Sequence, residues 1–138
     1  IGADVMVGFP GETEEQFAQT KALLCDLPMT YLHVFPYSLR EGTAAERLGD
    51  HLEKGTKKQR ARELIALSEK KRLAFHQRFV GQRLQVLTEG RQDPVTGLQV
   101  GLSDNYIKAL FTGTVANNTL IDIEVEQARE DLVFGAQI

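Results

Sequence analysis

The chain has 138 residues, of which 42% are hydrophobic and 25% are charged, and its formal net charge is −3. This length and composition are typical of one ordinary globular domain or two small ones. No run approaches the ~18 consecutive apolar residues of a membrane-spanning helix, and the single cysteine, Cys25, excludes an internal disulfide framework and a metal site made of cysteines alone.

The charges are segregated along the chain. Residues 1–53 carry 3 basic and 9 acidic side chains, residues 54–83 carry 10 basic and 2 acidic ones, and residues 84–138 carry 3 basic and 8 acidic ones. A basic block between acidic flanks indicates a polyanionic partner. The alternative is that the block is only the solvated face of a helix.

The first predicted element is a strand that runs into a tight turn, GFPG, at residues 8–11. The apolar residues 5–7 are typical of a strand covered on both faces, and a helix is predicted over residues 14–26, with Thr13 and Gln16 as its capping box. Ligands of α/β folds bind at the carboxyl ends of strands, so the turn is a candidate ligand site. A phosphate loop would need a different glycine spacing, and a turn that only joins strand to helix is the other alternative.

A second strand over residues 31–37 completes a right-handed βαβ unit with a parallel strand pair. His33 in this strand is either structural or a catalytic base or ligand, and Cys25 on the preceding helix is expected to be a small buried hydrophobic side chain. Residues 38–55 form an irregular loop with one helical turn at residues 44–48. Since the chain begins inside an apparent strand, we expect it to be a portion of a longer protein.

A long helix is predicted over residues 56–79, with Thr56 and Gln59 as its capping box and Gly81 after its end. Its apolar positions form one face that polar residues interrupt near the middle, so we infer that the first half packs on one body and the last turns on another. The face comprises Ala61, Leu64, Ile65, Phe75 and Phe79, with Ser68 and Arg72 between its halves.

From residue 82 onward the hydrophobic pattern has a period of two residues. Five short strands, with turns at residues 93–94 and 117–118, predict a small closed antiparallel barrel of the oligonucleotide-binding kind. Tyr106 is either a core tyrosine after a polar turn or an exposed ring that stacks on bases. In the second case Asn105 and Lys108 would supply hydrogen bonds and charge.

Several of these motifs, in this order, resemble the late part of the radical S-adenosylmethionine methylthiotransferases. They are DVMVGFPGET at residues 4–13, FPYS at 35–38 followed by Arg40 and by GTA at 42–44, GQRL at 81–84 and SDNY at 103–106. The last two resemble the RNA-binding TRAM barrel that closes those enzymes. Residues 32–38 and 102–106 are most similar to the branch that methylthiolates N6-threonylcarbamoyladenosine in tRNA. The isopentenyladenosine branch is the runner-up, and a third branch modifies a ribosomal protein.

The resemblance implies a fold of the class α/β plus all-β. Residues 1–55 would be the C-terminal βαβ portion of a radical-SAM, partly TIM-like barrel. Residues 56–79 would be a basic connecting helix, and residues 80–138 a small antiparallel OB-like TRAM barrel.

The resemblance also implies that the full-length enzyme uses S-adenosylmethionine and two [4Fe–4S] clusters to add a methylthio group at C2 of an adenosine next to the anticodon. It implies a cytoplasmic, monomeric protein that binds the tRNA anticodon stem-loop and no membrane. Six cluster cysteines are expected and only Cys25 is present, so this chain holds no metal ligand or catalytic residue and is expected to be inactive alone. The competing interpretations are a non-enzymatic RNA-binding module and a radical-SAM enzyme that acts on a small molecule.

The resemblance matches two segments to the strands that border adenosylmethionine, and these give the cofactor-binding candidates. They are Val7, Gly8, Phe9, Pro10, Gly11 and Glu12, together with Phe35, Pro36 and Tyr37. The RNA-binding candidates come from the basic helix and from the barrel. They are Lys58, Arg62, Lys71 and Arg78, together with Asn105, Tyr106 and Lys108.

Overall fold

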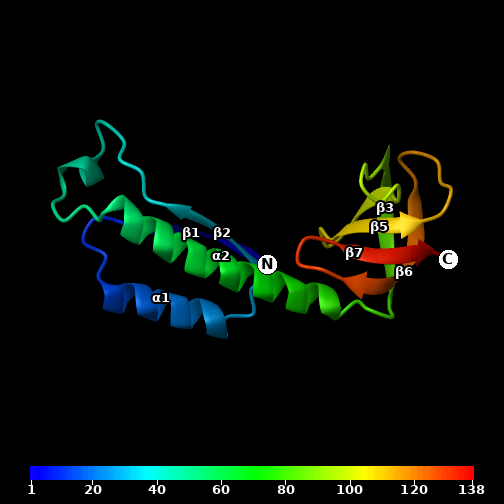
Figure 1. Cartoon of the computed structure of the whole chain (residues 1–138), viewed down its shortest axis with the longest axis horizontal. Helices are drawn as coiled ribbons and strands as arrows, with labels where there is room; N and C mark the ends of the chain where they lie inside the picture. Colours follow the sequence, from blue (N-terminus) through cyan, green and yellow to red (C-terminus); the bar gives the residue numbers. More distant parts are fainter. The chain divides into compact units, whose positions relative to one another are not determined.

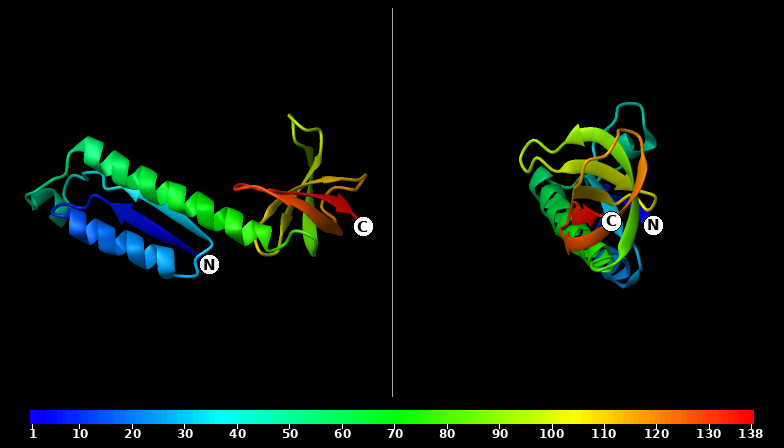
Figure 2. Two further views of the ribbon diagram at one scale, coloured as in Figure 1. Left: turned by 60° about the horizontal axis from the view of Figure 1, so that its bottom comes forward. Right: turned by 90° about the vertical axis from the view of Figure 1, so that its right-hand side faces the viewer.

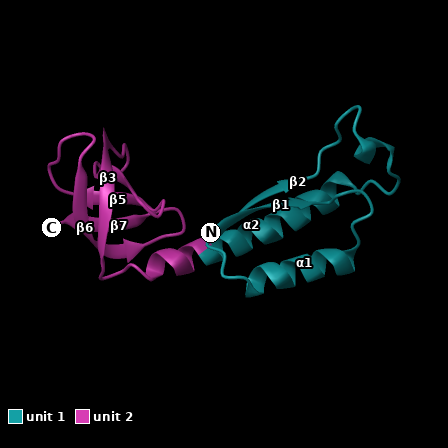
Figure 3. Cartoon of the chain, turned by 180° about the vertical axis from the view of Figure 1, so that it is seen from behind, with its two compact units in different colours: residues 1–71 teal, residues 72–138 magenta.

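A computed structural model describes residues 1–138 of the chain, with the elements arranged as Figure 1 shows. The chain divides into two compact units, Ile1–Lys71 and Arg72–Ile138, which Figure 3 distinguishes by colour. Neither α-helix combines the length and the apolar composition that a membrane-spanning helix requires.

The first unit contains a strand–helix–strand motif. Its elements are β1 (Gly2–Val7), α1 (Glu14–Asp26), β2 (Tyr31–Pro36), the short 3-10 helix η1 (Ala44–Arg47) and most of α2 (Lys54–Gln77). β1 and β2 pair in parallel, with Val5 opposite Val34, which confirms the predicted parallel pair. The predicted capping box of Thr13 and Gln16 is present at the start of α1, and η1 is the predicted helical turn of the loop.

The core of the first unit lies between one face of the sheet and side chains of both helices. Along β1 the side chains alternate, so that Val5 and Val7 are buried whereas Met6 is 46% exposed. The prediction of a strand covered on both faces is therefore wrong, because in this unit the sheet has only two strands and the buried cluster lies on one of its faces. That cluster comprises Val5, Val7, Phe17, Leu24, Leu32, Ala61 and Leu64.

Ser68 explains why a polar residue interrupts the apolar face of α2. Its buried hydroxyl accepts a hydrogen bond from Leu32 N (2.8 Å) and donates one to Leu32 O (3.0 Å). β2 pairs with a strand on one side only, and a backbone group buried without a partner costs free energy. The serine therefore satisfies the open edge of β2 where α2 covers it.

We predict that Ser68→Ala lowers the free energy of unfolding by about 1–3 kcal/mol, because it leaves a buried amide and a buried carbonyl unsatisfied. Urea denaturation of the 138-residue chain, followed by circular dichroism, measures the change. Ser38→Ala is the matched control, since Ser38 is exposed. Equal midpoints for the two variants would contradict the role of Ser68.

The second unit is a closed barrel of five strands (Figure 2), as predicted. The strands are β3 (Arg83–Gln92), β4 (Gln99–Ser103), β5 (Lys108–Thr112), β6 (Leu120–Ala128) and β7 (Val133–Gln137), and their order around the barrel is β3-β4-β5-β7-β6. The barrel is antiparallel, as predicted, except at one pair: β5 and β7 run parallel, with Ala109 opposite Val133. A closed ring with an odd number of strands cannot alternate direction at every pair, so at least one pair must be parallel.

The barrel is filled by residues at alternate strand positions. On β3, for example, Leu84 and Val86 are buried while the intervening Gln85 is exposed. Phe75 and Phe79, which follow Arg72 in the chain, pack against this core, whereas Ala61 and Leu64 belong to the core of the first unit. The inference that the two ends of the long helical segment serve different bodies is confirmed.

Two local predictions are wrong. The long helix spans Lys54–Gln77, not residues 56–79. Thr56 and Gln59 do not form its capping box, because the helix already includes both residues. Its backbone bonding begins before them, with Lys57 N donating to Glu53 O (3.1 Å). Cys25 is exposed rather than buried. It follows the buried Leu24 by one residue, and adjacent residues of a helix do not share a face.

Candidate functional site

The carboxyl ends of β1 and β2 bring together the two segments predicted to bind a cofactor. Val7 O accepts a hydrogen bond from Tyr37 N (2.8 Å), and the rings of Phe9 and Tyr37 meet edge to face, with centroids 5.4 Å apart. Residues 8–12 therefore lie beside the end of β2, as parallel pairing requires. We call this region, made of residues 7–12 and 35–37, the strand-end site.

Three backbone amides of the turn at residues 8–12 already donate hydrogen bonds within the chain. Gly8 N donates to Glu12 Oε1 (3.1 Å), Glu12 N donates to Phe9 O (2.9 Å), and Gly11 N donates to Asp50 O (3.0 Å). Glu14 also lies in the first turn of α1. A phosphate group would need free amides and a positive potential, so this geometry disfavours the phosphate-loop interpretation.

Tyr37 is the buried aromatic residue of the strand-end site. The residue is only 8% exposed, yet its hydroxyl has no hydrogen-bond partner in the chain. Its ring centroid lies 5.4 Å from that of Phe9 and 6.2 Å from that of His51, and Phe9 itself is 42% exposed. A flat heteroaromatic group, such as an adenosine, fits an exposed aromatic edge of the kind that Phe9 offers.

The face of the sheet opposite the helices carries paired polar and apolar side chains. His33 Nδ1 lies 3.2 Å from Asp4 Oδ1, and both side chains are exposed. Met6 is opposite Phe35 in the next row. No group of three His, Cys, Asp or Glu side chains in the chain could hold a metal ion.

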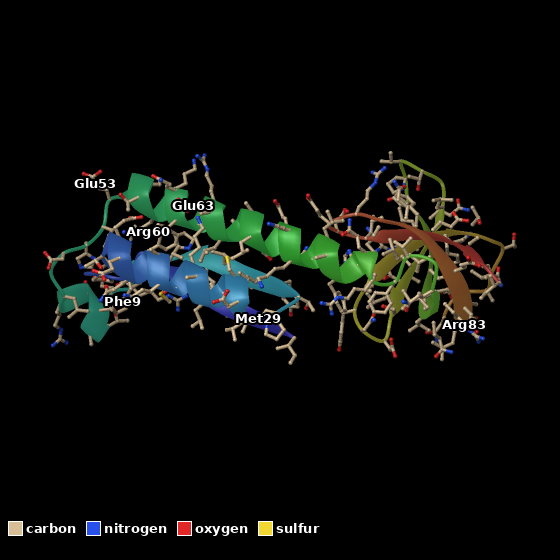
Figure 4. All side chains as sticks on the ribbon, turned by 90° about the horizontal axis from the view of Figure 1, so that it is seen from below. Phe9, Met29, Glu53, Arg60, Glu63 and Arg83 are labelled. Carbon is tan, nitrogen blue, oxygen red and sulfur yellow. The ribbon has the colours of Figure 1, made fainter.

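Sequence reasoning missed two cations on the inner face of α2, Lys57 and Arg60. The Arg60 guanidinium is buried and donates to Glu12 Oε1 (2.5 Å) and to Glu14 Oε2 (3.0 Å), so that it points from α2 towards the start of α1 (Figure 4). The available signal was helical spacing, since Lys57, Arg60 and Leu64 are three and four residues apart and share one face.

The RNA-binding candidates of α2 lie in different environments. Lys58 and Arg62 are exposed and, four residues apart, share a face with the exposed Lys54. We call these three residues the exposed cation row. Lys71 differs, because its ammonium donates to Cys25 O (3.0 Å) and Leu27 O (2.8 Å). It thereby satisfies carbonyl groups at the end of α1, where a cation also complements the helix dipole.

In the barrel unit, Tyr106 is 83% exposed and has a positive φ of 65°, which excludes the core alternative for this residue. Asn105 Oδ1 accepts a hydrogen bond from Ser103 Oγ (2.5 Å), Lys108 is half-buried, and Arg78 is exposed. The structure thus presents Tyr106 on the hairpin that Lys108 closes with Leu102.

Lys57 of α2 packs on the turn at Gly8, and this contact can be tested with glycine variants. Gly8 and Gly11 both have positive φ (73° and 81°), so alanine at either position costs about 1–2 kcal/mol of backbone strain. Only at Gly8 would the new Cβ also meet a side chain, 2.3 Å from Lys57 Cγ; at Gly11 there is open space. We predict that Gly8→Ala lowers the melting temperature more than Gly11→Ala.

Adding Lys57→Ala to Gly8→Ala should bring the melting temperature back towards that of Gly11→Ala, because it removes the contacted side chain. Differential scanning calorimetry of the four chains measures this. If both glycine variants melt together, Lys57 does not pack on the turn.

No family model matches the chain. Curated relatives are nevertheless similar over most of it. The threonylcarbamoyladenosine tRNA methylthiotransferase MtaB of Bacillus subtilis is 38% identical over 116 residues, which is 83% of this chain and 26% of the relative. The corresponding protein of Aquifex aeolicus is 45% identical over 109 residues, 78% of this chain and 24% of the relative.

The tRNA-2-methylthio-N(6)-dimethylallyladenosine synthase of Desulfitobacterium hafniense is 32% identical over 136 residues, which is 98% of this chain and 30% of the relative. The chain thus spans between about a quarter and three-tenths of the length of these relatives. The similarity to the Desulfitobacterium hafniense synthase covers nearly the whole chain, and therefore includes the strand-end site, the basic helix and the barrel. The chain belongs to the tRNA methylthiotransferase family.

Proposed function

We propose that this chain is the C-terminal part of a radical S-adenosylmethionine tRNA methylthiotransferase that acts on N6-threonylcarbamoyladenosine. The first unit would supply one edge of the adenosylmethionine pocket, and α2 and the barrel would contact the anticodon stem-loop of a cytoplasmic tRNA. The observation that carries the proposal is the strand-end site, with a parallel strand pair, an aromatic edge and an unsatisfied tyrosine hydroxyl, in a chain whose relatives are tRNA methylthiotransferases.

Within this proposal the strand-end site holds the adenosine portion of the cofactor. Phe9 would contact the base, and the Tyr37 hydroxyl would gain the hydrogen-bond partner that it lacks. When bound, adenosylmethionine and the iron–sulfur clusters supply the radical and sulfur-transfer chemistry. The cluster ligands would lie elsewhere in the full-length protein, since this chain has one cysteine and such clusters are held by several thiolates.

The dimethylallyladenosine branch is a second candidate for the substrate. The supporting observation is the similarity to the Desulfitobacterium hafniense synthase over 98% of this chain. Threonylcarbamoyladenosine is favoured because, among the relatives named above, the highest identity, 45% over 78% of this chain, is to a protein of that branch.

Nucleoside analysis separates the two branches. We predict that tRNA from cells without the full-length protein lacks the 2-methylthio form of N6-threonylcarbamoyladenosine and accumulates the unmodified form, as measured by mass spectrometry of hydrolysed tRNA. Expression of the full-length protein should restore it. Loss of the methylthio form of dimethylallyladenosine instead would transfer the protein to the second branch, and no change in either nucleoside would contradict both assignments.

We propose that the two units contact RNA by different forces. The exposed cation row on α2 is suited to phosphates. The barrel segment, residues 84–138, carries 3 basic and 8 acidic side chains, so charge favours RNA little there. It offers instead the exposed Tyr106 and a row of exposed leucines on neighbouring strands, with Leu87 opposite both Leu102 and Leu120. Such a surface is suited to the faces of unpaired bases.

A salt titration of tRNA binding to the full-length protein tests this division. The double variant Lys58→Ala/Arg62→Ala should weaken binding and reduce the slope of log K against log salt by about 1.4–1.8, because each lost phosphate contact contributes about 0.7–0.9. Tyr106→Ala should weaken binding by about 1–3 kcal/mol and leave the slope unchanged, because stacking does not depend on counterion release.

Lys71→Ala is the matched control for the double variant, since it removes a cation of the same helix that is bonded within the chain. It should leave the slope unchanged. If the double variant keeps the parent slope, the exposed cation row does not contact phosphates. If Tyr106→Ala binds as tightly as the parent, the barrel does not stack on bases through this residue.

A further inference from the structure

We propose that Arg60 and Lys57, on the inner face of α2, are positioning residues for the cofactor-binding turn at residues 8–12. The inference rests on the proposed function of the strand-end site and adds two residues to it. Both residues lie in the basic block, whose composition points to a polyanion, yet the structure directs them at the turn instead.

Arg60 is bonded to the turn at several points. Its Nη1 atom donates to Glu12 Oε1 (2.5 Å) and to Glu12 O (3.0 Å), and its Nη2 atom donates to Glu14 Oε2 (3.0 Å). The guanidinium carbon lies 5.2 Å from the centre of the Phe17 ring. One side chain of α2 thus fixes the backbone of the turn, its carboxylate and the first turn of α1.

Glu12 transmits this contact to Gly8. The carboxylate oxygen that accepts from Arg60 also accepts from Gly8 N (3.1 Å), and the Glu12 side chain is mostly buried. Without Arg60 the carboxylate would be an uncompensated charge in a buried place, a state that proteins avoid by rearranging or by admitting water. The conformation at Gly8, where β1 ends, therefore depends on the guanidinium.

Lys57 holds the turn and the end of β2 from the same helix. Its aliphatic part covers Gly8, so that a Cβ on that glycine would lie 2.3 Å from Lys57 Cγ. Its ammonium donates to Tyr37 O (3.3 Å) and lies 5.7 Å from the centre of the Tyr37 ring. The two cations thus contact both segments of the strand-end site, residues 7–12 and 35–37.

The burial of Arg60 distinguishes positioning from nucleic-acid binding and from plain packing. At 5% exposure the guanidinium is not accessible to a phosphate. An apolar side chain would fill such a place without the desolvation cost of a charge, but it could not hold a carboxylate against a backbone amide. Arginine supplies several donors in one fixed plane, so that its Nη1 atom can donate to Glu12 while its Nη2 atom donates to Glu14.

The first test measures the turn itself in the full-length protein. Hydrogen–deuterium exchange of peptides that cover residues 8–12 reports the Gly8 amide. Arg60→Met should increase its exchange rate at least tenfold, and Arg60→Lys, which keeps a charge but not the planar pair of donors, should give an intermediate rate. If Arg60→Met fails to fold, Arg60→Lys carries the same test. Parent-like exchange in the folded variants would overturn the proposal.

The second test measures affinity for adenosylmethionine by equilibrium dialysis with full-length variants. Arg60→Lys and Lys57→Met should each weaken binding at least fivefold. Lys71→Ala is the matched control, because it breaks a different tie between α2 and α1, far along the helix from the turn. Lys71→Ala should lower stability without changing the affinity for adenosylmethionine. If the role of Arg60 were only structural, the Arg60 variants would show the same result.

The two tests fail in different ways. Faster exchange at Gly8 together with parent-like cofactor affinity in every variant would mean that α2 holds the turn but that the turn does not bind adenosylmethionine. That outcome would overturn the proposed cofactor site and leave only the contacts by which α2 holds the turn. Parent-like exchange together with weakened affinity in Arg60→Lys would overturn the positioning role alone and leave the cofactor site in place.

Discussion

The buried contact between Arg60 and Glu12 is the interaction on which the strand-end site depends. A buried guanidinium and a buried carboxylate each need the other as the compensating charge, and they compensate each other here although the Nε atom of Arg60 has no hydrogen-bond partner in the chain. Here the carboxylate also accepts the Gly8 amide, so the same pair that solves the electrostatic problem determines the turn after β1. Phe9 lies in this turn, so the conformation of the turn also determines its edge-to-face contact with Tyr37.

The helix α2 has different tasks on its two faces. Its inner face carries Lys57, Arg60 and Lys71, all bonded to carbonyl or carboxylate oxygens of the first unit, whereas the exposed cation row faces solvent. Arg83, later in the same basic block, forms an ion pair with Asp122, which lowers the pKa of that carboxyl group. The strongly positive composition of residues 54–83 therefore overstates the charge available to a nucleic acid. The exposed part remains, and it is what a phosphate backbone could contact.

Local patterns in the sequence predicted the helices, strands and turns better than they predicted which side chains are buried. Three predictions follow from patterns within a few residues or from simple alternation. They are the capping box at Thr13, the parallel pair of β1 and β2, and the five-strand barrel. The exposure of Cys25 and of Met6 could not be predicted from such patterns, because it depends on which faces of the helix and the strand the rest of the fold covers. The parallel pair of β5 and β7 required the topology of a closed ring. For the site, the turn at residues 8–12 was predictable from glycine, proline and strand position, whereas Arg60 and Ser68 were not, since their partners are 48 and 36 residues away in the chain.

The affinity of the full-length Tyr37→Phe variant for adenosylmethionine tests the central claim most directly. The Tyr37 hydroxyl is buried without a partner in the chain, so its removal should leave the stability of the cofactor-free protein unchanged or higher. If the cofactor supplies the missing partner, the same change should weaken binding about three- to tenfold, the range expected for loss of one neutral hydrogen bond. Unchanged affinity in a variant of parent-like stability would contradict the assignment of adenosylmethionine to the strand-end site.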